Sequence, residues 1–125
     1  MEPAEMAYLK HVLLAEVKKT IKDLYGKGAE KIEMKISDYF IFIEWSGYLR
    51  MSELNLIRKQ SDQAKLISNY RKAISEGSRD IIIQRFENVL KRKVTNFIFE
   101  CDIPNNTAVF LFLLEEKKCK LEQVM

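Results

Sequence analysis

Two stretches of this chain alternate like β-strands yet carry apolar side chains on both faces. In residues 39–45, positions 40 and 42 are phenylalanine, while positions 39, 41, 43 and 45 are tyrosine, isoleucine, isoleucine and tryptophan. Residues 107–114 are apolar at nearly every position. Because successive side chains of a strand point to opposite faces, both strands need cover on two sides. A sheet with one layer of helices would leave one of those faces open.

The segments around these strands predict helices and two further strands. Apolar residues of the first segment recur every three or four positions, as on one face of a helix, and Gly26 and Gly28 end it. Ser52 is the expected N-cap of a second helix, and Gly77 lies inside a long third one. The expected order is helix 5–25, strand 31–36, strand 39–45, helix 53–60, helix 64–90, strand 94–103 and strand 107–114.

This order predicts an α+β fold with two layers, in which helices cover a four-stranded antiparallel sheet. The two halves share a loose pattern but few identical residues. The pattern therefore fits a duplicated αββ unit and equally fits convergence. A chain of 125 residues suits a single domain. Its core is expected over about 5–114, with a charged C-terminal tail over 115–125.

The surplus apolar surface predicts a protein partner. We expect a homodimer that uses the second sheet face or the long helix. The alternative is that helices 53–60 and 64–90 cover that face within one chain. Aromatic residues beside a fixed turn make good anchors. The predicted interaction surface consists of Tyr39, Ile41, Ile43, Trp45, Gly47, Tyr48, Val109, Leu111 and Leu113.

Few residues are available for catalysis or metal binding. His11 is the one histidine, which excludes a site built on two, and the two cysteines, Cys101 and Cys119, show no paired spacing. We expect Cys101 in the core and Asp102 as a turn-capping carboxylate before Pro104. The sequence therefore predicts no catalytic residue, no metal and no cofactor, although an enzyme or small-molecule-binding protein of unknown class stays open.

Charge offers a second interpretation. Lys and Arg number 21 against 18 Asp and Glu, a formal net charge of +3, which is modest for a nucleic-acid-binding protein. A candidate basic patch follows the long helix and its end: Arg79, Arg85, Lys91, Arg92 and Lys93. Acidic residues are interleaved with it, as on a solvated helix face. A nucleic-acid-binding module is the alternative function, and sheet aromatics could stack on bases.

Nothing at the start of the chain resembles a secretory signal, because residues 1–5 are polar and acidic. The longest apolar runs, 39–43 and 109–114, fall far short of the roughly 20 residues that span a bilayer. We expect a cytoplasmic protein with reduced thiols and no direct membrane insertion. A membrane component would be contacted through a partner.

Four short motifs resemble the MpsC-like family of small bacterial proteins. Residues 26–28 match that family's Gly-basic-Gly turn, with Ala29 in place of the following proline. Residues 47–49 match its glycine and hydrophobic pair after a strand, and Ser52-Glu53 matches its helix start. Asp102-Ile103 is similar to the end of a later strand. The resemblance covers roughly residues 15–114.

The resemblance implies a role beside a membrane. The family takes its name from a component of a sodium-translocating, membrane-potential-generating system that is also linked with inorganic-carbon uptake, and it has no established catalytic residues. By resemblance, the chain would be a non-enzymatic accessory or regulatory subunit. It would dock on membrane components from the cytoplasm through protein–protein contacts.

Overall fold

In a computed structural model that describes residues 3–59 and 62–116, the chain forms four helices and four strands. Their bounds are α1 (Pro3–Tyr25), β1 (Lys31–Ile36), β2 (Phe40–Ser46), α2 (Met51–Lys59), α3 (Gln63–Gly77), α4 (Arg79–Leu90), β3 (Val94–Asp102) and β4 (Thr107–Leu114). The strands differ by at most one residue at each end from the sequence prediction. Gln60, Cys119 and all of the predicted tail except Glu115 and Glu116 lie outside the described residues.

The strands form one antiparallel sheet in the order β1-β2-β4-β3. Each hairpin, β1–β2 and β3–β4, contributes one edge strand and one central strand. The two hairpins are therefore related by an approximate two-fold axis that runs perpendicular to the sheet between β2 and β4. On the covered face, α1 packs beside α4. A duplicated αββ unit would produce this arrangement.

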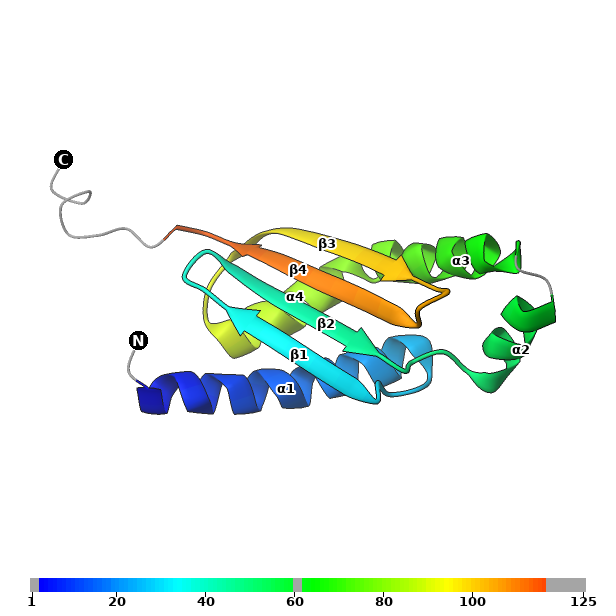
Figure 1. The fold of residues 1–125 in the computed structure, drawn as a ribbon. Helices are drawn as coiled ribbons and strands as arrows, with labels where there is room; N and C mark the ends of the chain where they lie inside the picture. Colours follow the sequence, from blue (N-terminus) through cyan, green and yellow to red (C-terminus); the bar gives the residue numbers. More distant parts are fainter. Residues whose placement is uncertain (1–2, 60–61, 117–125) are drawn as a thin grey trace, which may run out of the picture.

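The helices cover one face of the sheet only. Figure 1 shows the strands in front of α1, α3 and α4, with α2 beyond one end of the sheet. Side chains of the covered face and of these helices form the hydrophobic core. Within it, the Phe86 ring of α4 stacks on Phe112 of β4 with centroids 4.3 Å apart. The predicted two-layer α+β fold is confirmed.

One strand-face prediction is wrong. Alternation predicted that Ile41, Ile43 and Trp45 share one face of the sheet with Val109, Leu111 and Leu113. The register instead places Ile43 opposite Phe110 and Phe42 opposite Leu111. Opposite residues of an antiparallel pair share a face. The odd positions of β2 therefore point into the core, and Phe40 and Phe42 point to the open face.

The predicted helix 64–90 is two helices, because the chain leaves helical geometry at Ser78. Ser78 has φ −105° and ψ 9°, and α4 restarts at once, with the Ile82 N–H bonded to the Ser78 carbonyl. A Cβ built on Gly77 would meet no heavy atom within 4 Å. Gly77 therefore does not admit a neighbouring backbone, and its place at the break reflects the low helix propensity of glycine.

The start of α2 also differs from the prediction. Glu53 accepts a hydrogen bond from the Arg50 N–H (3.0 Å), and the Leu54 N–H donates to the Arg50 carbonyl (3.0 Å). Arg50 therefore occupies the N-cap position, with Glu53 closing the capping box from three residues later. Ser52 lies within the first turn and is not the cap. In the part of the chain that the structure describes, no helix is long and apolar enough to cross a membrane.

Candidate functional site

Motif residues that are far apart in the sequence meet at the end of the sheet nearest α2. Residues 26–28 follow α1, and residues 47–49 follow β2. The side-chain oxygen of Asn106, in the β3–β4 turn, accepts hydrogen bonds from the N–H groups of Tyr48 and Leu49, both at 3.0 Å. These bonds hold the β2–α2 connection against the turn, so the loop is ordered by tertiary contacts.

The connection places Tyr48 against a buried arginine. Arg71 of α3 is 3% exposed, and its Nη2 and Nε lie 2.6 and 3.3 Å from the two carboxylate oxygens of Glu53. The guanidinium carbon lies 5.1 Å from the centroid of the Tyr25 ring and 4.9 Å from that of Tyr48. We call these four residues the Arg71 cage. The Arg71 guanidinium, whose charge Glu53 neutralises, therefore contacts residues of α1, the β2–α2 loop and α2 from its own place on α3.

The tyrosine hydroxyls of the cage are not poised for acid–base chemistry at neutral pH. The Tyr25 hydroxyl is hydrogen-bonded to Ser75, whose own hydroxyl donates to the Arg71 carbonyl (3.1 Å). Burial raises the pKa of Tyr25 to about 12, against the smaller lowering effect of the Ser75 hydrogen bond and the Arg71 charge. Burial likewise raises the pKa of Tyr48. Both phenols therefore stay protonated and serve packing and hydrogen bonding.

A cavity of about 610 Å³ lies over the cage. Its walls come from the end of α1, the start of α2 and one side of α3. Apolar side chains, among them Leu24, Ile67 and Ile74, supply much of the lining, and Arg50 and Ser52 add polar groups. The volume lies within the range of small-molecule sites.

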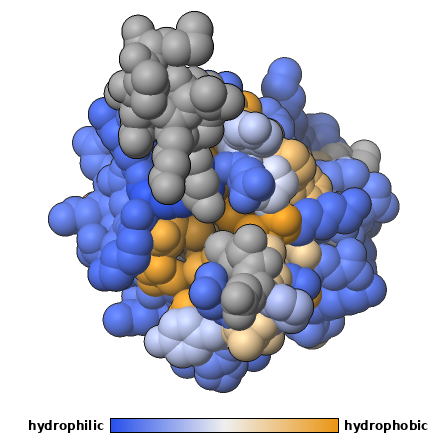
Figure 2. Space-filling model, turned by 90° about the vertical axis from the view of Figure 1, so that its left-hand side faces the viewer, coloured by the Kyte–Doolittle hydropathy of each residue, from blue (hydrophilic) through white to orange (hydrophobic). Residues whose placement is uncertain are grey.

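A smaller cavity of about 280 Å³ lies at the opposite end, between the start of α1 and the ends of β1 and β4. Figure 2 shows this end, with hydrophobic atoms at its centre and hydrophilic atoms around them. Arg92 lines this cavity and donates to the Glu115 carbonyl (2.6 Å). The cavity over the Arg71 cage is the larger of these two and is the better candidate for a ligand site.

The predicted interaction surface is split between the two faces of the sheet. Tyr39 is exposed, and Val109, Leu111 and Leu113 lie half-buried on the uncovered face. The other five members are buried and cannot form an exposed surface: Ile41, Ile43, Trp45, Gly47 and Tyr48. Tyr48 is instead a wall of the Arg71 cage, and Trp45 packs edge-on against Phe110, with ring centroids 4.4 Å apart.

The uncovered face carries a continuous apolar surface that the sequence analysis identified only in part. Its cross-strand neighbours are Phe40 with Leu113, Phe42 with Leu111, and Leu111 with Ile98. We call the following six residues the open-face patch: Phe40, Phe42, Ile98, Val109, Leu111 and Leu113. Phe40 and Ile98 are 37% and 40% exposed. Alternation alone could not identify Phe40, Phe42 and Ile98, because it does not say which face the helices cover.

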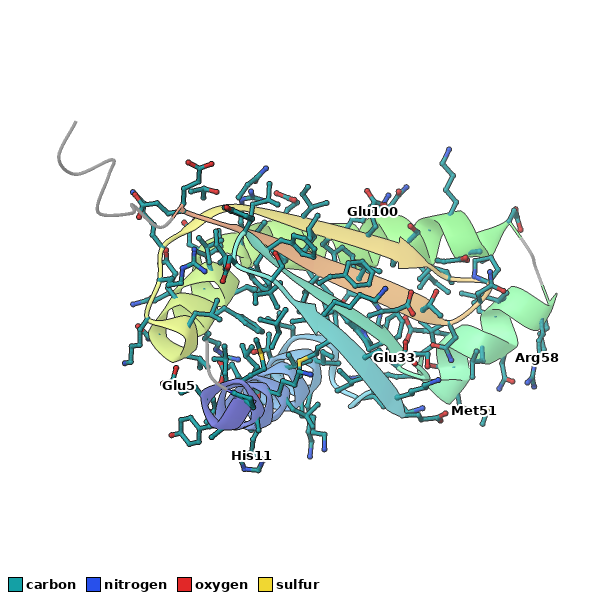
Figure 3. All side chains as sticks on the ribbon, turned by 60° about the vertical axis from the view of Figure 1, so that its left-hand side comes forward. Glu5, His11, Glu33, Met51, Arg58 and Glu100 are labelled. Carbon is teal, nitrogen blue, oxygen red and sulfur yellow. The ribbon has the colours of Figure 1, made fainter. Side chains whose placement is uncertain are left out.

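An acidic row borders the open-face patch. Glu33 lies opposite Glu44, Glu44 opposite Val109, and Val109 opposite Glu100. Figure 3 shows Glu33 on β1 and Glu100 on β3, the two edge strands. Lys31 lies 3.0 Å from Glu33, and Lys72 lies 3.3 Å from Glu100. Glu44 has no such ion pair within residues 3–59 and 62–116.

The candidate basic patch is not one surface. Arg79 donates to the side chain of Asn96 on β3 (2.6 Å). Arg85 faces α1, where its guanidinium lies 3.2 Å from the Asp23 carboxylate. The remaining three members follow α4 in the connection to β3: Lys91, Arg92 and Lys93. These side chains therefore point to different neighbours, and three of the five, Arg79, Arg85 and Arg92, already bind carboxylate or amide groups.

The other residues considered for chemistry have ordinary surroundings. His11 is exposed, and Figure 3 shows it on the side of α1 away from the sheet. Cys101 is half-buried beside the Ser68 hydroxyl (3.4 Å). Asp102 accepts both the backbone and the side-chain N–H of Asn105, as expected for a turn cap. Over the described ranges, no group of three or more His, Cys, Asp or Glu residues could hold a metal ion.

Comparison with known proteins gives one match. The model of the family described as "Na+-translocating membrane potential-generating system (MpsC)" matches residues 7–116 of this chain. No curated protein and no solved structure matches it. The matched range contains the Arg71 cage, the open-face patch and all of the motifs that carried the sequence resemblance.

Proposed function

The chain belongs to the MpsC family, and from this premise we propose that it is a non-enzymatic accessory or regulatory subunit of a membrane-potential-generating system. The chain acts by contacting another subunit of that system through the open-face patch. The family's description supports the system, and the uncovered apolar face supports the mode of action. The contact is made from the cytoplasmic side.

The observation that carries this proposal is the apolar face that no described helix covers. Strands spaced about 4.8 Å apart and rising about 3.3 Å per residue give the whole four-stranded face, which includes charged side chains of β1 beside the open-face patch, an area of about 500 Å². Covering it would bury about 1,000 Å² over both partners, the size of a transient interface rather than an obligate one. A face of this size suits an accessory subunit that associates and dissociates.

The acidic row indicates the chemistry of the partner. Like charges directly opposite each other on neighbouring strands destabilise a sheet. Glu33 and Glu44 form such a pair across β1 and β2. Lys31 compensates Glu33, whereas Glu44 is exposed and forms no ion pair within the described ranges. The partner is therefore a protein segment with an apolar stripe that covers Leu111 and a Lys or Arg that reaches Glu44.

Photocrosslinking in cells tests this proposal. A photoreactive amino acid replaces Leu111 in the patch or, as the control, Ile81 of α4, which is 54% exposed. We expect the probe at 111, and not at 81, to crosslink a subunit of the membrane-potential-generating system, identified by mass spectrometry. Glu44→Lys should abolish the crosslink, because it repels the partner's cation. In cells lacking the chain, Leu111→Glu should fail to restore the membrane potential, whereas Ile81→Glu should restore it.

The same experiment separates this proposal from self-association. The homodimer predicted from the sequence stays a prediction, and a second copy would use the same face. A crosslink from position 111 to another copy of the chain, with dimers in light scattering that Leu111→Glu dissociates, would overturn the heterologous contact. Equal crosslinking from positions 81 and 111 would also overturn it.

A further inference from the structure

The cavity over the Arg71 cage combines apolar walls with a charged rim. Leu66 and Tyr70 of α3 line it and are 61% and 64% exposed, so its mouth is also apolar. Arg71 and Glu53 form its floor and neutralise each other. The floor therefore contributes polar surface without net charge, and the charge of the site depends on its rim.

The charge on that rim comes from Arg50. Its guanidinium lies against the backbone of Gly26, where a Cβ would come within 1.7 Å of Nη2. Gly26 has φ +81°, a conformation that glycine adopts without strain. Across the described part of the chain, the Arg50 guanidinium forms neither a hydrogen bond nor an ion pair. An exposed guanidinium therefore lies at the mouth of an apolar cavity without a partner among the described residues.

The N-terminus of α2 adds further positive charge to the rim of the cavity. Arg50 is the N-cap of α2, so the positive end of the α2 dipole lies beside the same rim. Figure 3 shows Met51, the first residue of α2, near the start of β1, where the connecting loops meet. Among the described residues that line the cavity, the one carboxylate is that of Glu53, which is already paired with Arg71. The site as a whole favours a negative charge.

We infer that this cavity binds an anionic amphiphile, a molecule with one anionic group and an aliphatic or aromatic body. The anion accepts hydrogen bonds from Arg50 at the rim. The apolar body lies between Leu66, Ile67 and Ile74, over the Arg71 cage. This site is distinct from the open-face patch and goes beyond the proposed docking function.

Binding of matched ten-carbon compounds tests the inference. Isothermal titration with the full chain compares decanoate with decanamide and decylamine, which share the body but are neutral or cationic. We expect one decanoate per chain, bound at least about tenfold more tightly than decanamide, because hydrogen bonds to charged groups are worth about 1.5–3 kcal/mol. Arg50→Gln should reduce decanoate affinity to that of decanamide. Arg58→Gln, which removes an exposed arginine of the same helix that does not line the cavity, should leave it unchanged.

Two sources of such an anion are distinguished by a second arm. Flotation with phosphatidylglycerol vesicles reports binding to a bilayer lipid, and titration with decanoate reports binding of a free anion. Loss of either interaction in Arg50→Gln, but not in Arg58→Gln, supports the site and identifies its source. Equal binding of decanoate, decanamide and decylamine, or wild-type binding by Arg50→Gln in both arms, would overturn the inference. Circular dichroism confirms that each variant is folded.

Discussion

Removing Arg71 should destabilise the protein strongly, because its buried side chain is paired with the Glu53 carboxylate. In Arg71→Met, the Glu53 carboxylate, 18% exposed, loses its partner, and the rings of Tyr25 and Tyr48 lose the cation between them. Breaking a buried pair from one side costs about 3–5 kcal/mol. Because Glu53 keeps some contact with water, we expect about 3–4 kcal/mol, a large share of a typical domain's 5–15 kcal/mol.

The matched variants separate charge from geometry. Arg71→Lys keeps the cation but loses the two-pronged contact with Glu53, so it should fall between the wild type and Arg71→Met. Glu53→Met leaves Arg71 buried without a counterion and also removes the acceptor of the Arg50 N–H. Arg71→Met combined with Glu53→Met removes both charges. The double variant should therefore lose only some packing and the contribution of the α2 cap to stability, about 1 kcal/mol.

Urea unfolding followed by circular dichroism measures these differences. With a slope near 2 kcal/mol per M, Arg71→Met should lower the midpoint by about 1.5–2 M. The double variant should be more stable than the sum of the single changes by about 3 kcal/mol or more. If the single costs add to within about 0.5 kcal/mol, Arg71 and Glu53 do not act as a pair, and our account of the cage is refuted.

Three further predictions concern backbone and protonation. Gly47→Ala should lower the free energy of unfolding by about 2 kcal/mol or more, because Gly47 has φ +70° and a Cβ there would lie 2.7 Å from the Cβ of Glu30. A loss of less than about 0.5 kcal/mol in urea unfolding would contradict this. Gly77→Ala should instead raise stability by about 0.5–1 kcal/mol, measured in the same way, because nothing crowds that position. The free energy of unfolding should fall between pH 10 and 12, because the pKa of Tyr25 is about 12 when folded and about 10 when unfolded, so the folded state keeps a proton that the unfolded state loses. Burial also raises the pKa of Tyr48 and acts in the same direction. Urea titrations at several pH values should show a loss of about 1.4 kcal/mol per pH unit for each such group, and a flat profile would contradict it.

The long-range contacts of the cage explain why sequence reasoning missed it. Spacing places Ile67 and Ile74 of the predicted helix 64–90 on one apolar stripe, and the structure buries Arg71 and leaves Tyr70 exposed. One signal was present: Arg71 lies four residues after Ile67 and three before Ile74, the spacing of that same stripe. A charge at such a position implies a buried counterion. Which carboxylate supplies it depends on how α2 packs on α3.

Local patterns predicted the elements well because each strand and helix is encoded by neighbouring residues. The alternation of residues 31–36, the Pro104–Asn106 turn and the spacing of apolar residues along α1 are properties of short segments. The break at Ser78 is the exception. Gly77 weakens the helix locally, but the predicted helix 64–90 continues through it.

By itself, the sequence determined the α+β class, the order of its elements and the presence of more apolar strand surface than one helical layer covers. Only the tertiary structure decided which surface stays open and which charges are buried. A strand that is apolar on both faces could turn either face toward the core. The pairing of β2 with β4 selects one of them by placing Ile43 opposite Phe110. Likewise, Arg71 finds Glu53 and two tyrosines only after three helices and a loop have met. Periodicity is a property of one segment, whereas burial depends on what the rest of the chain places against it.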